Sequence, residues 1–137
     1  MIRKTKKGEG KVRNATPTEV DGIKFRSKLE AYTYTELKKA NIKAEYEPTH
    51  FTLIPAFIYN NEKVRKMTYL PDFVGDNFII ECKGLITDSF PLRWKVFKFA
   101  LHLTGAKYDL YLVRNQKDVD ALITKLKQND EDSNSVL

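Results

Sequence analysis

The sequence is poor in the residues that form disulfides and zinc sites. It has one cysteine, Cys82, and two histidines, His50 and His102, among 137 residues. A single cysteine excludes an internal disulfide and fits a reducing compartment, so we expect a cytoplasmic protein. Neither histidine has partners at metal-ligand spacing, which argues against a zinc site and favours structural roles for both.

Long hydrophobic runs and glycine-rich loops are also missing. No apolar stretch approaches the roughly 20 residues of a membrane span. The basic start of the chain is not followed by an apolar segment, so we expect neither a membrane anchor nor a secretory signal. No glycine-rich phosphate loop and no nucleophilic triad motif is visible, which argues against the enzyme classes that these motifs define.

Positive charge is in excess, with 24 Lys and Arg against 18 Asp and Glu, a net charge of +6. We expect a basic flexible arm over residues 1–20, a single domain over 21–127 and an acidic disordered tail over 128–137. A basic arm suits contact with nucleic acid, because each neutralised phosphate releases counterions, although it also suits a solvated tail. The arm residues expected to contact DNA are Arg3, Lys4, Lys6 and Lys7.

The order of hydrophobic patterns predicts a mixed α/β (α+β) fold. Apolar residues at helical spacing predict helices over residues 25–40, 89–104 and 118–127. Runs of β-branched and aromatic residues predict strands over residues 51–54, 57–59, 64–69, 78–83 and 108–113. This order of elements is typical of a mixed sheet with helices on its faces.

The segment most informative about chemistry is Pro71-Asp72 followed by Glu81-Cys82-Lys83. Hydrolysis of a phosphodiester is helped by a metal such as Mg²⁺, which prefers carboxylate and carbonyl oxygens. Asp72, Glu81 and the Cys82 backbone carbonyl could supply these ligands. Residues i and i+2 of a strand share a face, so Glu81 and Lys83 would point at one phosphate. Lys83 would orient or help deprotonate the attacking water, or offset charge in the transition state.

Two of these acids also have structural interpretations. Charged groups within the apolar run that contains Glu81 are costly to bury unless they are paired or bound to metal, so a structural ion pair with Lys83 is the alternative. Glu30 follows Ser27 in a capping-box pattern at the start of the first predicted helix. A helical acid facing the sheet could also hold a second metal, and the two roles do not exclude each other.

Basic side chains outside the arm give further candidate contacts to DNA. They lie before the first predicted helix and along the second: Lys24, Arg26, Lys28, Arg93, Lys95 and Lys98. A solvated surface is the alternative for these cations. Trp94 and Phe97 lie among them at helical spacing, which favours packing in the core over stacking on bases.

Three motifs resemble the PD-(D/E)xK, restriction-endonuclease-like nuclease superfamily. They are Phe25-Arg-Ser-Lys-Leu-Glu30, Pro71-Asp72-Phe73 and Ile80-Glu81-Cys82-Lys83-Gly84. Within this superfamily the chain is similar to phage endonuclease I-type Holliday junction resolvases. Residues 48–97 are also similar to small phage-encoded restriction-like nucleases.

The resemblance implies a central mixed sheet of four to five strands flanked by helices, with Mg²⁺ or Mn²⁺ as the cofactor. It implies Glu30, Asp72, Glu81 and Lys83 as catalytic residues. The metal ligands would be Asp72, Glu81, the backbone carbonyl of Cys82, and Glu30.

The activity that the resemblance implies is that of a homodimeric, metal-dependent endodeoxyribonuclease acting on branched DNA, such as a Holliday junction. It would serve phage recombination or DNA processing in the host-cell cytoplasm, beside phage replication or recombination proteins. One alternative is a nuclease for linear duplex DNA, of the transposition, restriction or repair type. A non-catalytic DNA-binding module with the same fold is another, and a ribonuclease also stays open.

Overall fold

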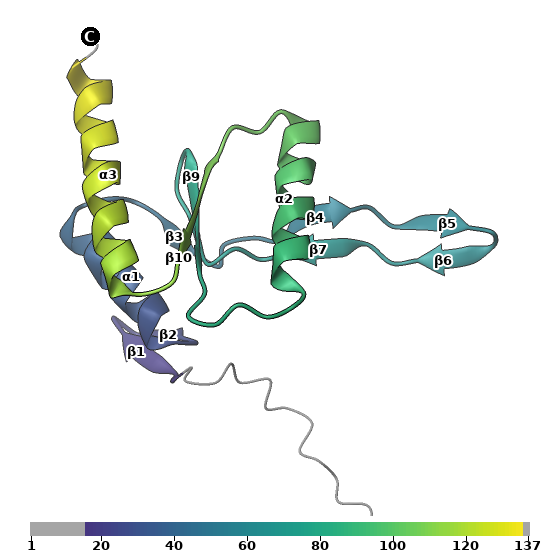
Figure 1. The fold of residues 1–137 in the computed structure, drawn as a ribbon, viewed down its shortest axis with the longest axis horizontal. Coiled ribbons are helices and arrows are strands. Elements are labelled where there is room, and N and C mark those ends of the chain that lie inside the picture. The colour runs from purple at the N-terminus through teal and green to yellow at the C-terminus, as the bar shows by residue number, and fades with distance from the viewer. Residues whose placement is uncertain (1–15, 136–137) are drawn as a thin grey trace, which may run out of the picture.

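A four-stranded mixed sheet lies between the helices of the protein (Figure 1). The computed structural model describes residues 16–135. The strands of the sheet, in spatial order, are β10 (Asp109–Val113), β9 (Phe78–Cys82), β8 (Phe73–Val74) and β3 (Glu45–Tyr46). β9 and β10 run parallel, whereas β8 runs antiparallel to both β9 and β3. The mixed α+β class predicted from the sequence is confirmed.

Helices cover both faces of this sheet. α1 (Lys28–Lys39) and α3 (Gln116–Ser135) lie together on one face, and α2 (Phe90–Thr104) lies on the other (Figure 1). α2 ends at Gly105, whose φ of 71° is the left-handed conformation typical of a helix C-terminus. Across residues 16–135, no helix combines the length and apolarity that a membrane span requires.

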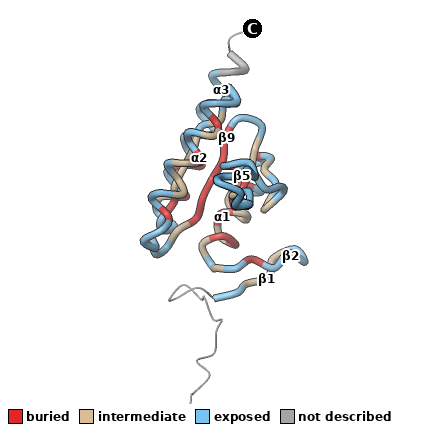
Figure 2. The backbone as a smooth tube through the Cα atoms, turned by 90° about the vertical axis from the view of Figure 1, so that its right-hand side faces the viewer, coloured by how far each residue is buried: buried red, intermediate tan, exposed pale blue. Residues whose placement is uncertain are grey.

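β9 divides the core into two layers, because its side chains alternate between the two faces of the sheet. Phe78, Ile80 and Cys82 pack into a cluster with residues of α1 and α3. Ile79 packs on the opposite face, in a cluster that includes Phe97 of α2. All residues of β9 are buried, and Figure 2 shows the strand as a continuous buried segment through the middle of the molecule.

A long two-stranded hairpin over residues 51–69 projects past α2, away from α1 and α3 (Figure 1). Its strands are β4 (Phe51–Ile54), β5 (Phe57–Tyr59), β6 (Glu62–Val64) and β7 (Met67–Tyr69). β4 pairs with β7 near the sheet, and β5 pairs with β6 at the tip. Asn60 and Asn61 form the turn with φ values of 46° and 64°, as a two-residue hairpin turn requires. The strand predicted over 64–69 is therefore divided between β6 and β7.

Both ends of the chain correct the sequence prediction. The arm predicted over residues 1–20 is wrong for residues 18–20, which form β1 (Thr18–Val20) and pair with β2 (Ile23–Phe25). The predicted tail is wrong for residues 128–135, because α3 continues to Ser135. Adding residues to an already nucleated helix gains one hydrogen bond for each residue fixed. The predicted DNA contacts Arg3, Lys4, Lys6 and Lys7 lie outside the described residues.

The layered core predicts unequal costs for two identical substitutions in α2. Phe97 is fully buried, whereas Phe99 is 58% exposed. Phe97→Ala is expected to lower the free energy of unfolding by about 3–5 kcal/mol, and Phe99→Ala by less than about 1 kcal/mol. Urea unfolding of both variants measures the difference, and equal losses would contradict the placement of α2 on the sheet.

Candidate metal centre

The register of the sheet sets three acidic residues side by side at one end of neighbouring strands. The antiparallel pairing of β8 with β9 continues so that Asp72 opposes Glu81. The pairing of β3 with β8 likewise opposes Glu47 to Asp72. The Glu47 N–H donates to the Asp72 carbonyl oxygen at 2.8 Å, as this register requires. The acids are therefore positioned by backbone pairing.

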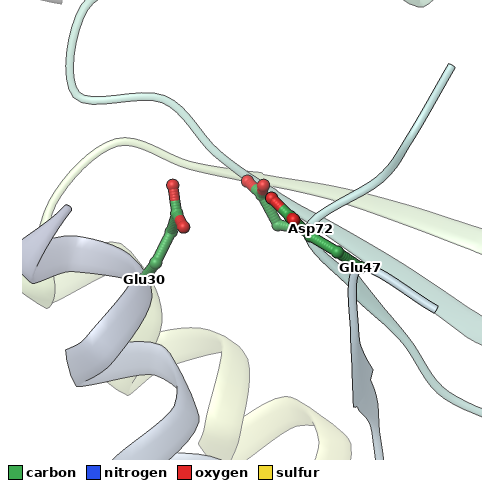
Figure 3. Close-up of side chains that lie close together, drawn as sticks. All are labelled: Glu30, Glu47 and Asp72. Atoms are coloured by element: carbon green, nitrogen blue, oxygen red, sulfur yellow. The ribbon is translucent and has the colours of Figure 1, made fainter. Parts of the chain in front are cut away.

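Glu30, Glu47 and Asp72 form what we call the acid cluster. One carboxylate oxygen from each residue lies within 4.8 Å of the others. Figure 3 shows Glu30 on α1 and, across from it, Glu47 and Asp72 close together. Glu30 and Asp72 are each only 7% exposed, and Glu47 is half-buried. Carboxylate oxygens are the ligands preferred by hard divalent cations, so this buried group could hold a metal ion.

Hydrogen bonds hold all three carboxylates, and that of Glu47 accepts from the Arg26 guanidinium at 3.5 Å. Asp72 Oδ2 accepts from the Cys82 N–H at 2.8 Å, which ties the carboxylate to the end of β9. Glu30 Oε2 accepts from the Tyr46 hydroxyl and from the Arg26 N–H, the latter at 3.2 Å. Glu30 therefore contributes to the start of α1 and to the acid cluster at once.

Glu81 lies beside the acid cluster and is not a member of it. The Tyr69 hydroxyl donates a hydrogen bond to its carboxylate. Lys83 Nζ lies 3.9 Å from Glu81 Oε1 and 5.2 Å from the centre of the Phe90 ring. Glu81 and Lys83 thus share one face, as their spacing predicts. The assignment of Glu81 and the Cys82 carbonyl as metal ligands stays a prediction.

Burial makes both central acids hard to ionise. Desolvation raises the pKa of Asp72 well above its usual range, and repulsion from Glu81 and Glu30 adds to this effect. Desolvation also raises the pKa of Glu81 to about 7, although the Tyr69 hydroxyl and Lys83 oppose the shift. Neighbouring buried carboxylates of like charge are costly unless a cation compensates them. The donor set and its excess negative charge therefore fit a divalent cation.

The basic residues predicted to contact DNA differ in their availability. Arg26 Nε lies 3.3 Å from Glu47 Oε1, and Arg93 donates to the Thr68 carbonyl oxygen at 2.9 Å. The other four are exposed, as Arg26 is: Lys24, Lys28, Lys95 and Lys98. Lys98 Nζ lies 6.0 Å from the centre of the Trp94 ring. Arg26 and Arg93 thus have partners within the protein, and DNA contact by any of the six stays a prediction.

Two aromatic residues of α2 belong to the core. Phe97 is fully buried, and Trp94 packs partly buried against the same cluster. Their rings lie 5.9 Å apart and both contact the Tyr69 ring. The core interpretation of these residues is confirmed. Their packing also supports Tyr69, which holds Glu81.

Glu47 is the member of the acid cluster that the sequence analysis missed. It follows the short strand β3 and precedes Pro48, with no spacing motif that connects it to Asp72. Its φ of 45° lies in the left-handed region, which is uncommon for glutamate. Only the pairing of β3 with β8 brings it into the cluster, and a two-residue strand leaves little signal in the sequence.

A family model described as "Protein of unknown function (DUF1064)" matches residues 11–117. The chain belongs to this family. The matched segment of the DUF1064 chain contains the whole acid cluster together with Glu81 and Lys83. No curated protein and no solved structure matches the chain. The family description assigns no activity.

The stability of the metal-free DUF1064 chain is expected to fall as the pH rises from about 4.5 to 7. The pKa of Glu81 in the folded state, about 7, is above its ordinary value of 4.5. The folded state therefore holds the proton more tightly, and the free energy of unfolding decreases with pH across this window. Glu81→Gln removes this ionisation and should flatten the profile, measured by urea unfolding in a chelator. The exposed acid Glu45→Gln is the control, and an unchanged slope in Glu81→Gln would contradict the assignment.

Mg²⁺ or Mn²⁺ is expected to raise the melting temperature of the wild-type chain. A ligand that binds only the folded state at 100 times its Kd adds about 2.7 kcal/mol to stability. Asp72→Asn and Glu47→Gln each remove one charged donor of the acid cluster and should abolish most of this shift. In metal-free buffer, Asp72→Asn should melt at a higher temperature than wild type, because it removes the cost of burying an ionisable carboxyl group beside other acids. Glu62→Gln, at the exposed hairpin tip, should keep the full metal-dependent shift.

Proposed function

We propose that this protein is a metal-dependent endodeoxyribonuclease that hydrolyses phosphodiester bonds in DNA. The observation that carries the proposal is the convergence of Glu30, Glu47 and Asp72, with the Glu81 and Lys83 pair beside them. Buried acids next to a lysine form a donor set for a cation and a phosphate, whereas a purely structural role would leave their excess negative charge uncompensated. The resemblance of residues 30, 72, 81 and 83 to the PD-(D/E)xK motif supports the same activity.

The acid cluster supplies the proposed binding site for Mg²⁺ or Mn²⁺. A bound divalent ion neutralises charge on the phosphate and makes water more acidic. Asp72, Glu47 and Glu30 would hold the ion, with Glu81 and the Cys82 carbonyl as further oxygen donors nearby. The hydrogen bond from the Cys82 N–H keeps one Asp72 oxygen fixed, so its carboxylate need not reorganise when substrate binds.

Glu81 and Lys83 would act on the attacking water and on the negative charge of the phosphate. The Glu81 carboxylate lies beside the Lys83 ammonium, so this pair could orient the attacking water and accept its proton. The Lys83 side chain is 26% exposed, so its ammonium can meet a phosphate from solvent while it stays near Glu81. Its positive charge would stabilise the negative charge that develops on the phosphate oxygens.

Branched DNA is the substrate class proposed within this activity, cut by a homodimer in the manner of a Holliday junction resolvase. The support is the resemblance of the motifs to phage endonuclease I-type resolvases. The net charge of +6 also favours association with a polyanion. Four-way junctions and linear duplexes differ in geometry but contain the same phosphodiester bond. A comparison of the two therefore separates the nuclease activity from the preference for branched DNA.

Wild-type protein is expected to cut a labelled four-way junction symmetrically in the presence of Mg²⁺ or Mn²⁺. Asp72→Asn and Lys83→Ala should each lower the cutting rate by at least about 100-fold, since each removes a group that acts on the transition state. Lys107→Ala, which removes an exposed lysine outside the site, should cut at the wild-type rate.

The same assay includes the matching linear duplex and an RNA duplex. Equal cutting of junction and linear DNA would keep the nuclease and remove the junction preference. Cutting of RNA alone would replace the deoxyribonuclease with a ribonuclease. Metal-independent binding without any cutting would overturn the catalytic proposal in favour of a DNA-binding module.

A further inference from the structure

We infer that the hairpin of residues 51–69, called the hairpin arm below, contacts duplex DNA that is bound at the acid cluster. Its tip would insert into a groove of this duplex. This inference deepens the proposed function and rests on it for the position of the DNA. The hairpin arm contains none of the candidate site residues, so this contact with the substrate is an additional one.

The tip of the hairpin arm exposes large apolar side chains on both of its faces. Phe57, Ile58 and Tyr59 are 46%, 70% and 62% exposed. Residues that oppose each other across antiparallel strands share a face, so Tyr59 lies with Glu62 on one face and Ile58 lies with Lys63 on the other. A two-stranded ribbon of this kind is marginally stable in water by itself, and exposed apolar groups gathered in one place mark a contact surface.

The charge of the tip favours a polyanion over a second copy of the chain. Between residues 57 and 66 the tip carries three cations, Lys63, Arg65 and Lys66, against one acid, Glu62. Among the described residues, no ion pair involves any of these three cations. Two copies joined tip to tip would bring like charges together, whereas phosphates on either side of a groove would neutralise them.

The shape and position of the hairpin arm fit a duplex that passes over the acid cluster. The major groove of B-DNA is about 12 Å wide and admits a two-stranded β-ribbon. The arm is rooted in the site, because β7 ends at Tyr69, which binds Glu81, and Asp72 follows three residues later. From Tyr69 to the turn at Asn61 an extended chain spans about 26 Å, the rise of roughly eight base pairs.

Binding of the full-length protein to a fluorescent 30-base-pair duplex in metal-free buffer tests the hairpin arm without any requirement for cutting. The triple variant Lys63→Ala/Arg65→Ala/Lys66→Ala should bind about tenfold or more weakly, and its slope of log affinity against log salt should be smaller by up to about 2.7. The matched control Lys107→Ala/Lys117→Ala/Lys127→Ala loses the same charge from exposed positions outside the arm. Equal losses of affinity in the two triple variants would overturn the inference, as would an absence of DNA binding by wild type.

A second variant, Phe57→Ser/Ile58→Ser/Tyr59→Ser, separates DNA from a second copy as the occupant. The inference expects weaker DNA binding with an unchanged oligomeric state by light scattering. Dissociation of a dimer with unchanged DNA binding would overturn it. Thermal unfolding of every variant establishes that weaker binding does not come from unfolding, since the substituted residues are exposed.

A labelled position reports contact directly. Cys82 is buried and is the chain's one cysteine, so Ile58→Cys can carry an environment-sensitive dye selectively. Duplex DNA should change the dye signal at Ile58→Cys and leave it unchanged at Thr124→Cys on α3. The same response at both positions, or none at position 58, would overturn the inference. Failure to cut DNA with arm binding intact would instead remove only the proposed nuclease activity.

Discussion

The hydrogen bond from the Cys82 N–H to Asp72 ties the start of β8 to the end of β9, at the point where the core meets the acids. The core residues beside it, Phe73 and Ile80, are fully buried. The packing that excludes water from this region also raises the pKa of Asp72. Stability and the proposed chemistry therefore both depend on β8 and β9. If the core around them were looser, water would reach the carboxylates and their orientation would be lost.

Glu30 connects this strand end to the helical layer. Its backbone N–H donates to Ser27 Oγ at 3.1 Å, while its side chain accepts from the Arg26 N–H and reaches the acid cluster. A capping group is ordinarily exposed, but here it is buried against Tyr46 and Asp72. The first turn of α1 is thus fixed relative to the sheet by the carboxylate that the cluster needs. Glu30 can therefore stabilise the start of α1 and contribute to the acid cluster in the same conformation.

The sequence predicted the parts of this arrangement that depend on local periodicity. The apolar run of β9 and the helical spacing in α2 give clear patterns, and the i, i+2 spacing of Glu81 and Lys83 places them together. Glu47 was missed because its position depends on a nonlocal pairing of very short strands. The β1–β2 hairpin could have been found, since Asp21-Gly22 is a common two-residue turn. The helical tail of α3 had no apolar pattern to mark it.

Tyr69 belongs to both the site and the hairpin arm. It contacts Glu81 and is also the last residue of β7. Its hydroxyl lowers the pKa of Glu81 against the effect of burial, and its ring packs on Trp94 and Phe97. β7 carries Tyr69 at the base of the arm. The packing of α2 against this ring holds the Tyr69 hydroxyl beside Glu81, so the base of the arm and the site share one part of the core.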